Sequence, residues 1–334
     1  MDASLLTVDN LHVRIGSHGR EAHAVRGISF SIARGETLSI VGESGCGKSM
    51  TSLAVMGLLP RTARRTTDGI RLDGARIDGL SERGMSDLRG ARMAMIFQEP
   101  MTALNPVYTI GNQLEEAYRR HHAAARGQAR DRAVHLLEKV GITAAPERMR
   151  QYPHQLSGGL RQRVMIAMAL MCGPQLIIAD EPTTALDVTI QAQILRLLRD
   201  LQVEFNLSLL LITHDLGIVA RIADRVAVMY AGEFVETGPT REVFRRPVHP
   251  YTRGLLDAIP VPGRTERGGK LAAIPGSVPS LTAEADGCSF FDRCPRAVAG
   301  CATGRVDMTE PKPGRGWRCR LPFLDAAQAA ETAP

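Results

Sequence analysis

A run of residues near the N-terminus has the types and spacing of a phosphate-binding loop. Its members are Gly42, Glu43, Ser44, Gly45, Cys46, Gly47, Lys48, Ser49 and Met50. The glycines let the backbone curl so that N–H groups point at phosphate oxygens, and a helix that begins there adds partial positive charge. Lys48 is expected to reach the β- and γ-phosphates of a nucleotide, and the Ser49 hydroxyl to bind Mg²⁺. An apolar run at residues 38–41 supplies the preceding strand that this motif requires.

Two adjacent carboxylates, Asp180 and Glu181, follow a short apolar run at residues 176–179. A buried strand there would place both carboxylates at its C-terminal end, where open α/β sheets bind ligands. Asp180 is expected to act on the Mg²⁺, directly or through its ligands. Glu181 is expected to orient or deprotonate an attacking water, as phosphoryl transfer to water requires. A purely structural role is disfavoured because adjacent carboxylates in an apolar setting are costly without a cation.

A serine and two glycines, Ser157, Gly158 and Gly159, open a predicted helix and form a second anion-binding helix terminus. A chain with two such termini needs two phosphate partners, or one partner shared between chains. The segment 156–163 that contains them resembles the signature of the ABC ATPase family. Further elements of that family follow the same order here. They are Gln98 after an apolar run, Asp187 at the end of Ala185-Leu186-Asp187, and His214 after another apolar run.

The resemblance to ABC ATPases covers about residues 5–240 and implies a role for each motif. Two cassettes would face each other head to tail, so that Ser157 and Gly159 contact a nucleotide bound by the partner chain and Asp187 crosses the interface. Gln98 would sense the Mg²⁺ and the γ-phosphate and relay that state to a membrane partner, and His214 would hold the γ-phosphate. The expected catalytic residues are Glu181, His214 and Lys48, and the expected Mg²⁺ ligands are Ser49, Gln98 and Asp180.

The adenine contact departs from the family pattern. ABC ATPases normally place an aromatic residue on the base, but residues 15–25, where it is expected, contain no Phe, Tyr or Trp. A histidine or an arginine can pack on the base instead. The candidates are His18, Arg20 and His23, and the sequence does not choose between them.

The elements that must position these residues alternate between strands and helices. Apolar runs at residues 37–41, 93–97, 176–179 and 207–213 predict buried strands, and the amphipathic segment 187–205 predicts a helix. This alternation predicts an α/β fold with a largely parallel sheet. Residues 109–150 lack strand signals and predict a helical insertion. The resemblance implies the ABC nucleotide-binding domain, with a P-loop core, an antiparallel β region and a helical subdomain at about residues 100–165.

Composition narrows the function classes. The chain carries 41 Lys+Arg against 35 Asp+Glu, and a net charge of +6 is weak evidence for an anionic partner. Aromatic residues make up 4%, so base-stacking on nucleic acid is not expected. The most apolar stretch, 166–179, is interrupted by Gly173 and Pro174 and is too short to cross a bilayer. The N-terminus also lacks a secretory signal pattern. A cytoplasmic location is therefore expected, with the six cysteines as thiols or metal ligands.

After residue 245 the sequence becomes rich in proline and glycine, which predicts a loop-rich extension. We therefore expect an ATPase domain at 1–245 and an extension at 246–334. The extension carries Cys288, Cys294, Cys301 and Cys319, whose spacing differs from the paired pattern of common zinc ribbons. Residues 246–256 and 287–295 resemble the C-terminal extension of oligopeptide/dipeptide-importer ATPases, some of which carry a [4Fe–4S] cluster on these cysteines. The alternatives are Zn²⁺ and metal-free thiols.

This resemblance implies an ATPase, the motor subunit of a membrane importer for di- or oligopeptides, with ATP and Mg²⁺ as its nucleotide and metal. The expected partners are a second homologous ATPase subunit in a heterodimer, two transmembrane permease subunits and an extracytoplasmic substrate-binding protein, with no nucleic acid. The permeases would hold the chain at the cytoplasmic face of the inner membrane. Nickel and glutathione-type importers share the style of tail and are the alternative. A soluble ABC ATPase that acts on ribosomes or DNA is disfavoured by the single cassette.

Overall fold

The computed structural model describes residues 4–17, 20–99, 103–123, 126–184, 186–259, 273–279 and 286–324. It divides into two compact units, each built from several stretches of the chain. Unit 1 comprises Met1–Leu6, Ile32–Glu36 and Arg71–Ile212. Unit 2 comprises Thr7–Ser31, Thr37–Ile70 and Thr213–Pro334.

A parallel sheet forms the core of unit 1. Its strands are β7 (Met93–Ile96), β8 (Leu176–Asp180) and β9 (Ser208–Thr213), in the order β7-β8-β9. Every residue of β8 and β9 is buried, as expected of strands covered on both faces. Helix α8 (Val188–Phe205) lies between β8 and β9 in the sequence and turns a stripe of apolar residues inward. These elements confirm the predicted strands and helix to within two residues.

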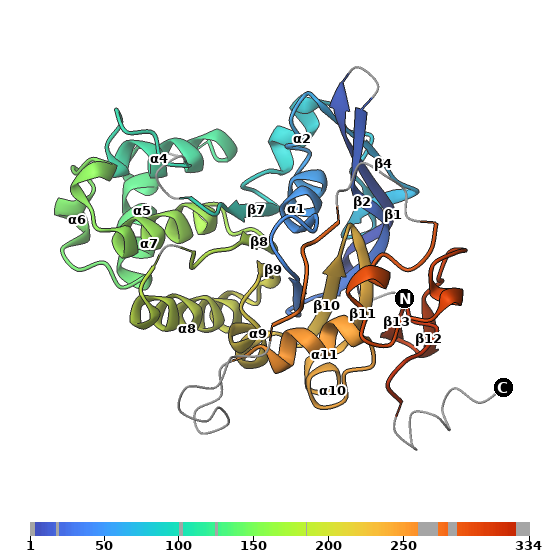
Figure 1. Cartoon of the computed structure of the whole chain (residues 1–334). Coiled ribbons are helices and arrows are strands. Elements are labelled where there is room, and N and C mark those ends of the chain that lie inside the picture. Colours follow the sequence, from blue (N-terminus) through green and yellow to red (C-terminus); the bar gives the residue numbers. More distant parts are fainter. Residues whose placement is uncertain are drawn as a thin grey trace. The chain divides into compact units, whose positions relative to one another are not determined.

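The rest of unit 1 is mainly helical. Contacts join α4 (Ile110–His121), α5 (Arg126–Lys139), α6 (Ala145–Arg148) and α7 (Gly158–Leu170), which lie together in Figure 1. The Thr109 hydroxyl caps α4 by accepting from the Asn112 N–H. Short elements, η1 (Pro153–Gln155), α2 (Glu82–Leu88) and β6 (Ala75–Arg76), complete the unit. The helical insertion predicted over residues 109–150 is thereby confirmed.

Unit 2 contains the mixed sheet that carries the phosphate-binding loop. Its strands are β3 (Thr37–Val41), β10 (Arg225–Tyr230), β11 (Glu233–Pro239), β13 (Arg315–Trp317) and β12 (Thr309–Lys312), in that spatial order. The pair β3–β10 is parallel, and the other pairs are antiparallel. The helices are α1 (Lys48–Met56), α9 (Leu216–Ile222), α10 (Thr240–Arg245) and α11 (Pro250–Asp257). The extension includes two single turns, η2 (Phe291–Arg293) and η3 (Ala299–Cys301).

An antiparallel β region is built from long strands near the N-terminus. Strands β1 (Ser4–Ser17) and β2 (Arg20–Ala33) each begin in one unit and end in the other, and β4 (Ala63–Thr66) pairs with β1 inside unit 2. Strand β5 (Gly69–Leu72) pairs with β6. The family resemblance implied such a region, whereas residue patterns alone did not predict the long strands.

The extension is loop-rich as predicted, but two of its strands join the sheet of unit 2. Strand β13 pairs with β11, and both Trp317 and Arg315 on β13 are buried. The Arg315 guanidinium donates to the Glu236 carboxylate, which also accepts from the backbone N–H groups of Val248 and His249. A three-residue strand of this composition has no apolar alternation, so the sequence does not reveal it.

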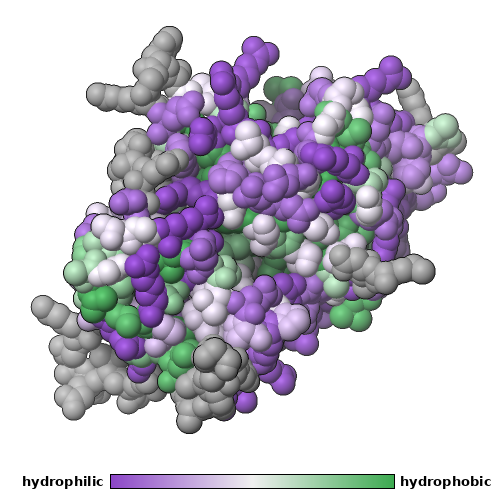
Figure 2. All heavy atoms as spheres, turned by 90° about the vertical axis from the view of Figure 1, so that its right-hand side faces the viewer, coloured by the Kyte–Doolittle hydropathy of each residue, from purple (hydrophilic) through white to green (hydrophobic). Residues whose placement is uncertain are grey.

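Within the described residues, no helix is both long and apolar enough to cross a bilayer. Figure 2 views the side on which the extension lies in Figure 1. Hydrophilic residues predominate there, with apolar residues scattered among them, as is usual for a water-facing surface.

Candidate functional site

The predicted phosphate-binding loop runs from β3 into α1 and depends on glycine where other chain segments come close. A Cβ on Gly42 would lie 2.2 Å from the carbonyl oxygen of Met229, and a Cβ on Gly47 would lie 2.1 Å from that of Ala24. Both glycines also have positive φ, 156° and 109°. Any side chain at these positions would displace the backbone of a neighbouring strand, so the curled shape of the loop requires glycine.

Lys48 is buried, with 4% of its surface exposed, and its ammonium group is held by the loop itself. Nζ donates to the carbonyl oxygens of Gly42 (2.8 Å) and Glu43 (2.9 Å). A third contact of Nζ, to Sγ of Cys46 at 3.8 Å, is long and weak, so this donor can turn to a phosphate oxygen. Burial raises the pKa of the neighbouring Cys46 thiol, which is fully buried and acts as packing. Of the other loop residues, Ser44 and Gly45 are exposed, and Ser49 and Met50 are half-buried.

The acidic pair lies where it was predicted, at the end of β8. Asp180 is 5% exposed, and Glu181 follows it with a left-handed backbone, φ 46°. The Glu181 carboxylate accepts from Nε2 of Gln98 (3.3 Å) and from the Thr184 hydroxyl (2.7 Å), both on Oε2. Left-handed backbone at a residue other than glycine costs roughly 1–3 kcal/mol and gathers at functional sites. The structure therefore brings together the predicted sensor Gln98 and the predicted base Glu181.

The residues predicted to meet a partner chain lie at the starts of two helices, α7 and α8. Ser157 caps α7, its hydroxyl accepting from the N–H of Leu160 (3.4 Å), and Ser157 and Gly158 are exposed. A Cβ on Gly159 would lie 3.0 Å from Ile190 Cγ2, so the helix start packs closely there. Asp187 is exposed and caps α8, while Ala185 lies outside the described residues. An exposed helix start of this kind is a suitable anion site.

His214 is exposed between the end of β9 and the start of α9, whose first turn is capped by Asp215. It belongs to unit 2, together with Lys48 and the rest of the phosphate-binding loop. The residues Gln98, Asp180, Glu181, Ser157 and Asp187 belong to unit 1.

Of the three adenine candidates, His18 and the side chain of Arg20 lie outside the described residues. His23 is half-buried on β2 and lines a cavity of about 270 Å³ in unit 2 together with His12 and Arg26. The choice of base-stacking residue stays open.

The four cysteines of the extension surround one small cavity of about 10 Å³. Burial raises the pKa of the Cys288 and Cys294 thiols, and it raises the pKa of Cys319 to about 11; the nearby Cys301 adds to all three shifts. The backbone N–H of Cys288 donates to the Cys301 carbonyl (2.9 Å), which ties two of the four together. No three His, Cys, Asp or Glu side chains among the described residues are grouped as ligands of one metal ion.

Three contacts at the site were not predicted from the sequence. Thr184 donates to Glu181, as described above, and two residues of the extension hold Glu43 of the loop. The Glu43 N–H donates to the Tyr251 hydroxyl (2.9 Å), and Arg293 forms a bidentate ion pair with the Glu43 carboxylate (2.7 and 2.9 Å). Tyr251 and Arg293 lie within the segments that resemble the importer extension, but no residue pattern links them to the loop.

Comparisons with known proteins identify the family of the chain. Residues 25–184 match the family model "ABC transporter", and residues 235–301 match "Oligopeptide/dipeptide transporter, C-terminal region". The chain is 52% identical to the dipeptide transport ATP-binding protein DppD of Bacillus subtilis over 89% of this chain and 88% of that protein. It is 47% identical to DppD of Escherichia coli over 97% of this chain and 99% of that protein.

Solved structures share the fold. The dimeric ATP-binding cassette MJ0796, bound to ADP and phosphate, matches with a TM-score of 0.64 at 26% identity, covering 71% of this chain and 99% of that one. CbiO1 of Clostridium perfringens, part of the ABC transporter complex cbiONQ, matches with a TM-score of 0.60 at 30% identity, covering 73% of this chain and 92% of that one. The chain belongs to the ABC transporter family and is one of its ATP-hydrolysing ATP-binding subunits.

Proposed function

We propose that the chain is the motor of a membrane importer for di- or oligopeptides. The observation that carries this proposal is the match of residues 235–301 to the oligopeptide/dipeptide transporter C-terminal region. The names of the relatives described above, which are dipeptide transport proteins, support the same cargo. Importers of nickel or glutathione are the second candidate, because they share the style of the extension.

In the proposed hydrolysis, each family motif acts on ATP. Lys48 turns the donor that weakly contacts the Cys46 sulfur to the β- and γ-phosphates, and His214 holds the γ-phosphate. Glu181 orients and deprotonates the attacking water, with Gln98 and Thr184 fixing the direction of its carboxylate. The developing charge on the γ-phosphate is met by the N–H groups at the start of α1.

Bound Mg²⁺ would supply charge neutralisation between the β- and γ-phosphates. The residues proposed to hold it are Ser49, Asp180 and Gln98, which offer a hydroxyl, a carboxylate and an amide oxygen. Hard oxygen donors of this kind fit Mg²⁺, which takes few protein ligands and fills its other positions with phosphate oxygens and water.

The exposed start of α7 supports a shared site between two chains. We propose that Ser157 and Gly159 contact the nucleotide of a partner ATPase and that Asp187 crosses the interface. The partner is a second, homologous ATPase subunit, so that the pair is a heterodimer. Two permease subunits hold this pair at the cytoplasmic face of the membrane, and a substrate-binding protein delivers the cargo. No nucleic acid takes part.

The domain division that we propose is functional: ATPase machinery in 1–245 and an importer-specific extension in 246–334.

For the extension we propose a [4Fe–4S] cluster on the four cysteines. Four thiols around one cavity are a soft-ligand set that suits iron–sulfur chemistry. A Zn²⁺ ion on the same thiols, or thiols without a metal, are the alternatives.

Uptake by intact cells tests the cargo. Deleting the gene should abolish uptake of labelled di- and oligopeptides and leave uptake of nickel and glutathione unchanged. The wild-type gene should restore peptide uptake, and the Glu181→Gln variant should not. Loss of nickel or glutathione uptake instead would move the chain to the second candidate. A tagged chain found on ribosomes, with no permease beside it, would contradict any transport role.

A further inference from the structure

Glu43 of the phosphate-binding loop is held through all of its polar groups. Its carboxylate receives two N–H bonds from the Arg293 guanidinium, at 2.7 and 2.9 Å, and its backbone N–H donates to the Tyr251 hydroxyl at 2.9 Å. Its carbonyl oxygen accepts from Nζ of Lys48 at 2.9 Å. The first two partners belong to the extension, and the third is the residue expected to bind phosphate. Glu43 thus links the extension to the phosphate-binding lysine within unit 2.

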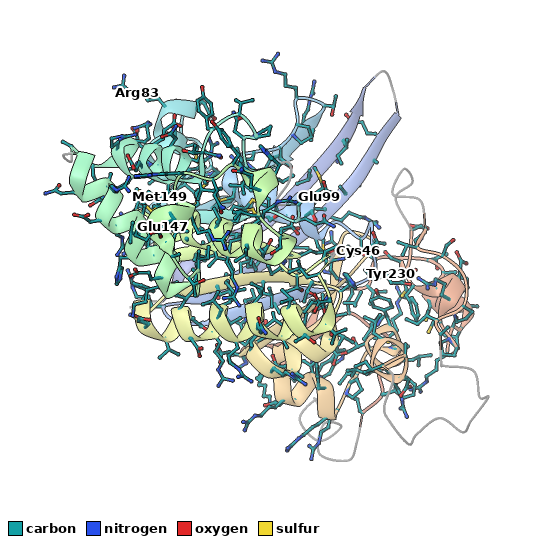
Figure 3. All side chains as sticks on the ribbon, turned by 90° about the vertical axis from the view of Figure 1, so that its left-hand side faces the viewer. Cys46, Arg83, Glu99, Glu147, Met149 and Tyr230 are labelled. Atoms are coloured by element: carbon teal, nitrogen blue, oxygen red, sulfur yellow. The ribbon has the colours of Figure 1, made fainter. Side chains whose placement is uncertain are left out.

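The two partners in the extension are themselves fixed in place. Tyr251 is fully buried, and its ring packs on the rings of Tyr230 (centroids 4.6 Å apart) and Phe290 (5.3 Å). Tyr230 and Cys46, which belong to β10 and to the loop, are both labelled in Figure 3. Burial raises the pKa of Tyr251, so its hydroxyl stays protonated at physiological pH.

Arg293 is equally well held. Its side chain is 5% exposed, its Nε donates to the carbonyl of Pro275 (2.8 Å), and Nη2 reaches the carbonyl of Ile274 (3.4 Å). The Tyr230 hydroxyl accepts a further bond from Nη1 at 3.4 Å. A guanidinium with this many fixed partners is a rigid anchor, so the ion pair restrains Glu43 rather than the reverse.

The charge of Glu43 makes this anchor matter for nucleotide binding. A carboxylate in a loop that must receive a polyphosphate repels it, and the repulsion is strong where water is partly excluded. Arg293 neutralises that carboxylate and fixes its position through a two-bond geometry that lysine cannot reproduce. The bond from Lys48 to the Glu43 carbonyl then keeps the ammonium group at the position from which it meets phosphate.

We propose that Arg293 is a positioning residue of the nucleotide site. It acts through Glu43 to hold the loop open to phosphate, so the extension is a working part of the ATPase. The inference rests on the ATP binding shared by the family and not on the peptide cargo.

The test compares MgADP binding to four variants of the full-length chain by calorimetry. Arg293→Ala leaves the Glu43 carboxylate unpaired and should weaken MgADP binding about tenfold. Adding Glu43→Gln to that variant removes the repelling charge and should recover most of the loss. The single variant Glu43→Gln completes a double-mutant cycle, which isolates the coupling between Arg293 and Glu43. Arg320→Ala is the matched control, because among the described residues this arginine of the extension bonds only to carbonyl groups of the extension, including those of Thr303 and Gly304.

Steady-state ATPase assays of the assembled transporter give a second readout. Arg293→Ala should raise KM for ATP about tenfold while kcat changes less than threefold, since a ground-state contact is lost. Wild-type affinity in Arg293→Ala overturns the proposal. So does a double variant that binds no better than Arg293→Ala, or an equal loss in Arg320→Ala, because either result would mean general damage to the extension. If Arg293→Ala cannot be purified, Arg293→Gln with and without Glu43→Gln makes the same comparison.

Discussion

Gln98 donates from Nε2 to Oε2 of Glu181 across 3.3 Å, which joins the second residue after β7 to the first residue after β8. The Thr184 hydroxyl donates to the same oxygen at 2.7 Å. The carboxylate proposed as the base is therefore oriented by two donors and by its own left-handed backbone. The rate of hydrolysis should therefore fall when either donor is removed, even though the Glu181 carboxylate itself remains.

Replacing Gln98 by alanine should lower kcat of the assembled ATPase about tenfold, because Glu181 loses one of its two orienting donors. Binding of Mg²⁺-free nucleotide to the isolated chain should change little, whereas binding of MgATP should weaken because a proposed Mg²⁺ ligand is lost. Gln193→Ala is the control, since Gln193 is exposed on α8 and its side-chain oxygen accepts from Arg163 at 3.1 Å, away from Glu181 in the sequence and in its bonding. Phosphate release measures kcat for both. Equal rates for the two variants would remove the orienting role from Gln98.

Glu181→Gln should lower the hydrolysis rate at least about a hundredfold, as expected when a general base is lost. The variant should retain bound ATP, because the amide keeps the shape of the side chain. Filter binding of labelled ATP and a phosphate-release assay measure the two properties. Glu147→Gln, an exposed change on α6 labelled in Figure 3, serves as the control and should match the wild type. Turnover that survives Glu181→Gln would mean that another group is the base.

Arg315→Ala should lower the free energy of unfolding by about 3 kcal/mol, because it leaves the fully buried Glu236 carboxylate without its counter-charge. Lys312→Ala breaks an ion pair with Glu242 whose side chains are 43% and 45% exposed, and should cost less than about 1 kcal/mol. Urea unfolding followed by the fluorescence of Trp317, the one tryptophan of the chain, measures both. Similar losses in the two variants would show that burial does not decide the cost.

Cys294→Ser should strip the extension of its proposed cluster. Anaerobically purified wild-type chain should contain about four irons per chain with sulfide and a broad visible absorption, and the variant should contain far less. Cys172→Ser lies outside the cavity and should keep the wild-type iron content. One zinc per wild-type chain, or no metal at all, would contradict the cluster.

Acid should destabilise the chain through His249. Burial lowers the pKa of this side chain from 6.5 to about 3. Between these two pH values the His249 side chain is protonated in the unfolded state and neutral in the folded state. The free energy of unfolding therefore falls as the pH drops from about 6.5 towards 3. The slope from this group is about 1.4 kcal/mol per pH unit. His249→Asn retains an acceptor for the Tyr251 N–H (3.1 Å in the wild type) and does not titrate. Melting temperatures between pH 7 and 5 should fall less steeply in this variant, and identical slopes would contradict the assignment.

Much of the fold could be predicted because its core strands are continuous apolar runs. Strand β3 matches the predicted run at residues 37–41, and β8 extends its run by one residue to Asp180. Helix α8 lies within the predicted segment 187–205 and begins one residue later, with Asp187 as its cap. These signals are local, since burial on both faces of a sheet forces an apolar run whatever the remote neighbours are.

The unpredicted parts depend on contacts between distant residues. Arg293 and Glu43 are 250 positions apart, and nothing in either neighbourhood indicates the other. Strand β13 owes its place to pairing with β11 and to the buried Arg315, not to its own pattern. The left-handed backbone of Glu181 arises from the junction between β8 and the turn after it. The sequence predicted the chemical role of Glu181 but not the backbone conformation that orients its carboxylate.

The contact between Glu43 and Arg293 also has a consequence for the order of synthesis. The ribosome adds residues at about 5–20 per second, so Arg293 follows Glu43 by roughly 12 to 50 seconds. During that interval the loop and its helix are complete in sequence, yet the carboxylate of Glu43 has no counter-charge. A growing chain, or one that stops early, would bind ATP weakly. Nucleotide would then be captured efficiently only by finished chains that carry the extension.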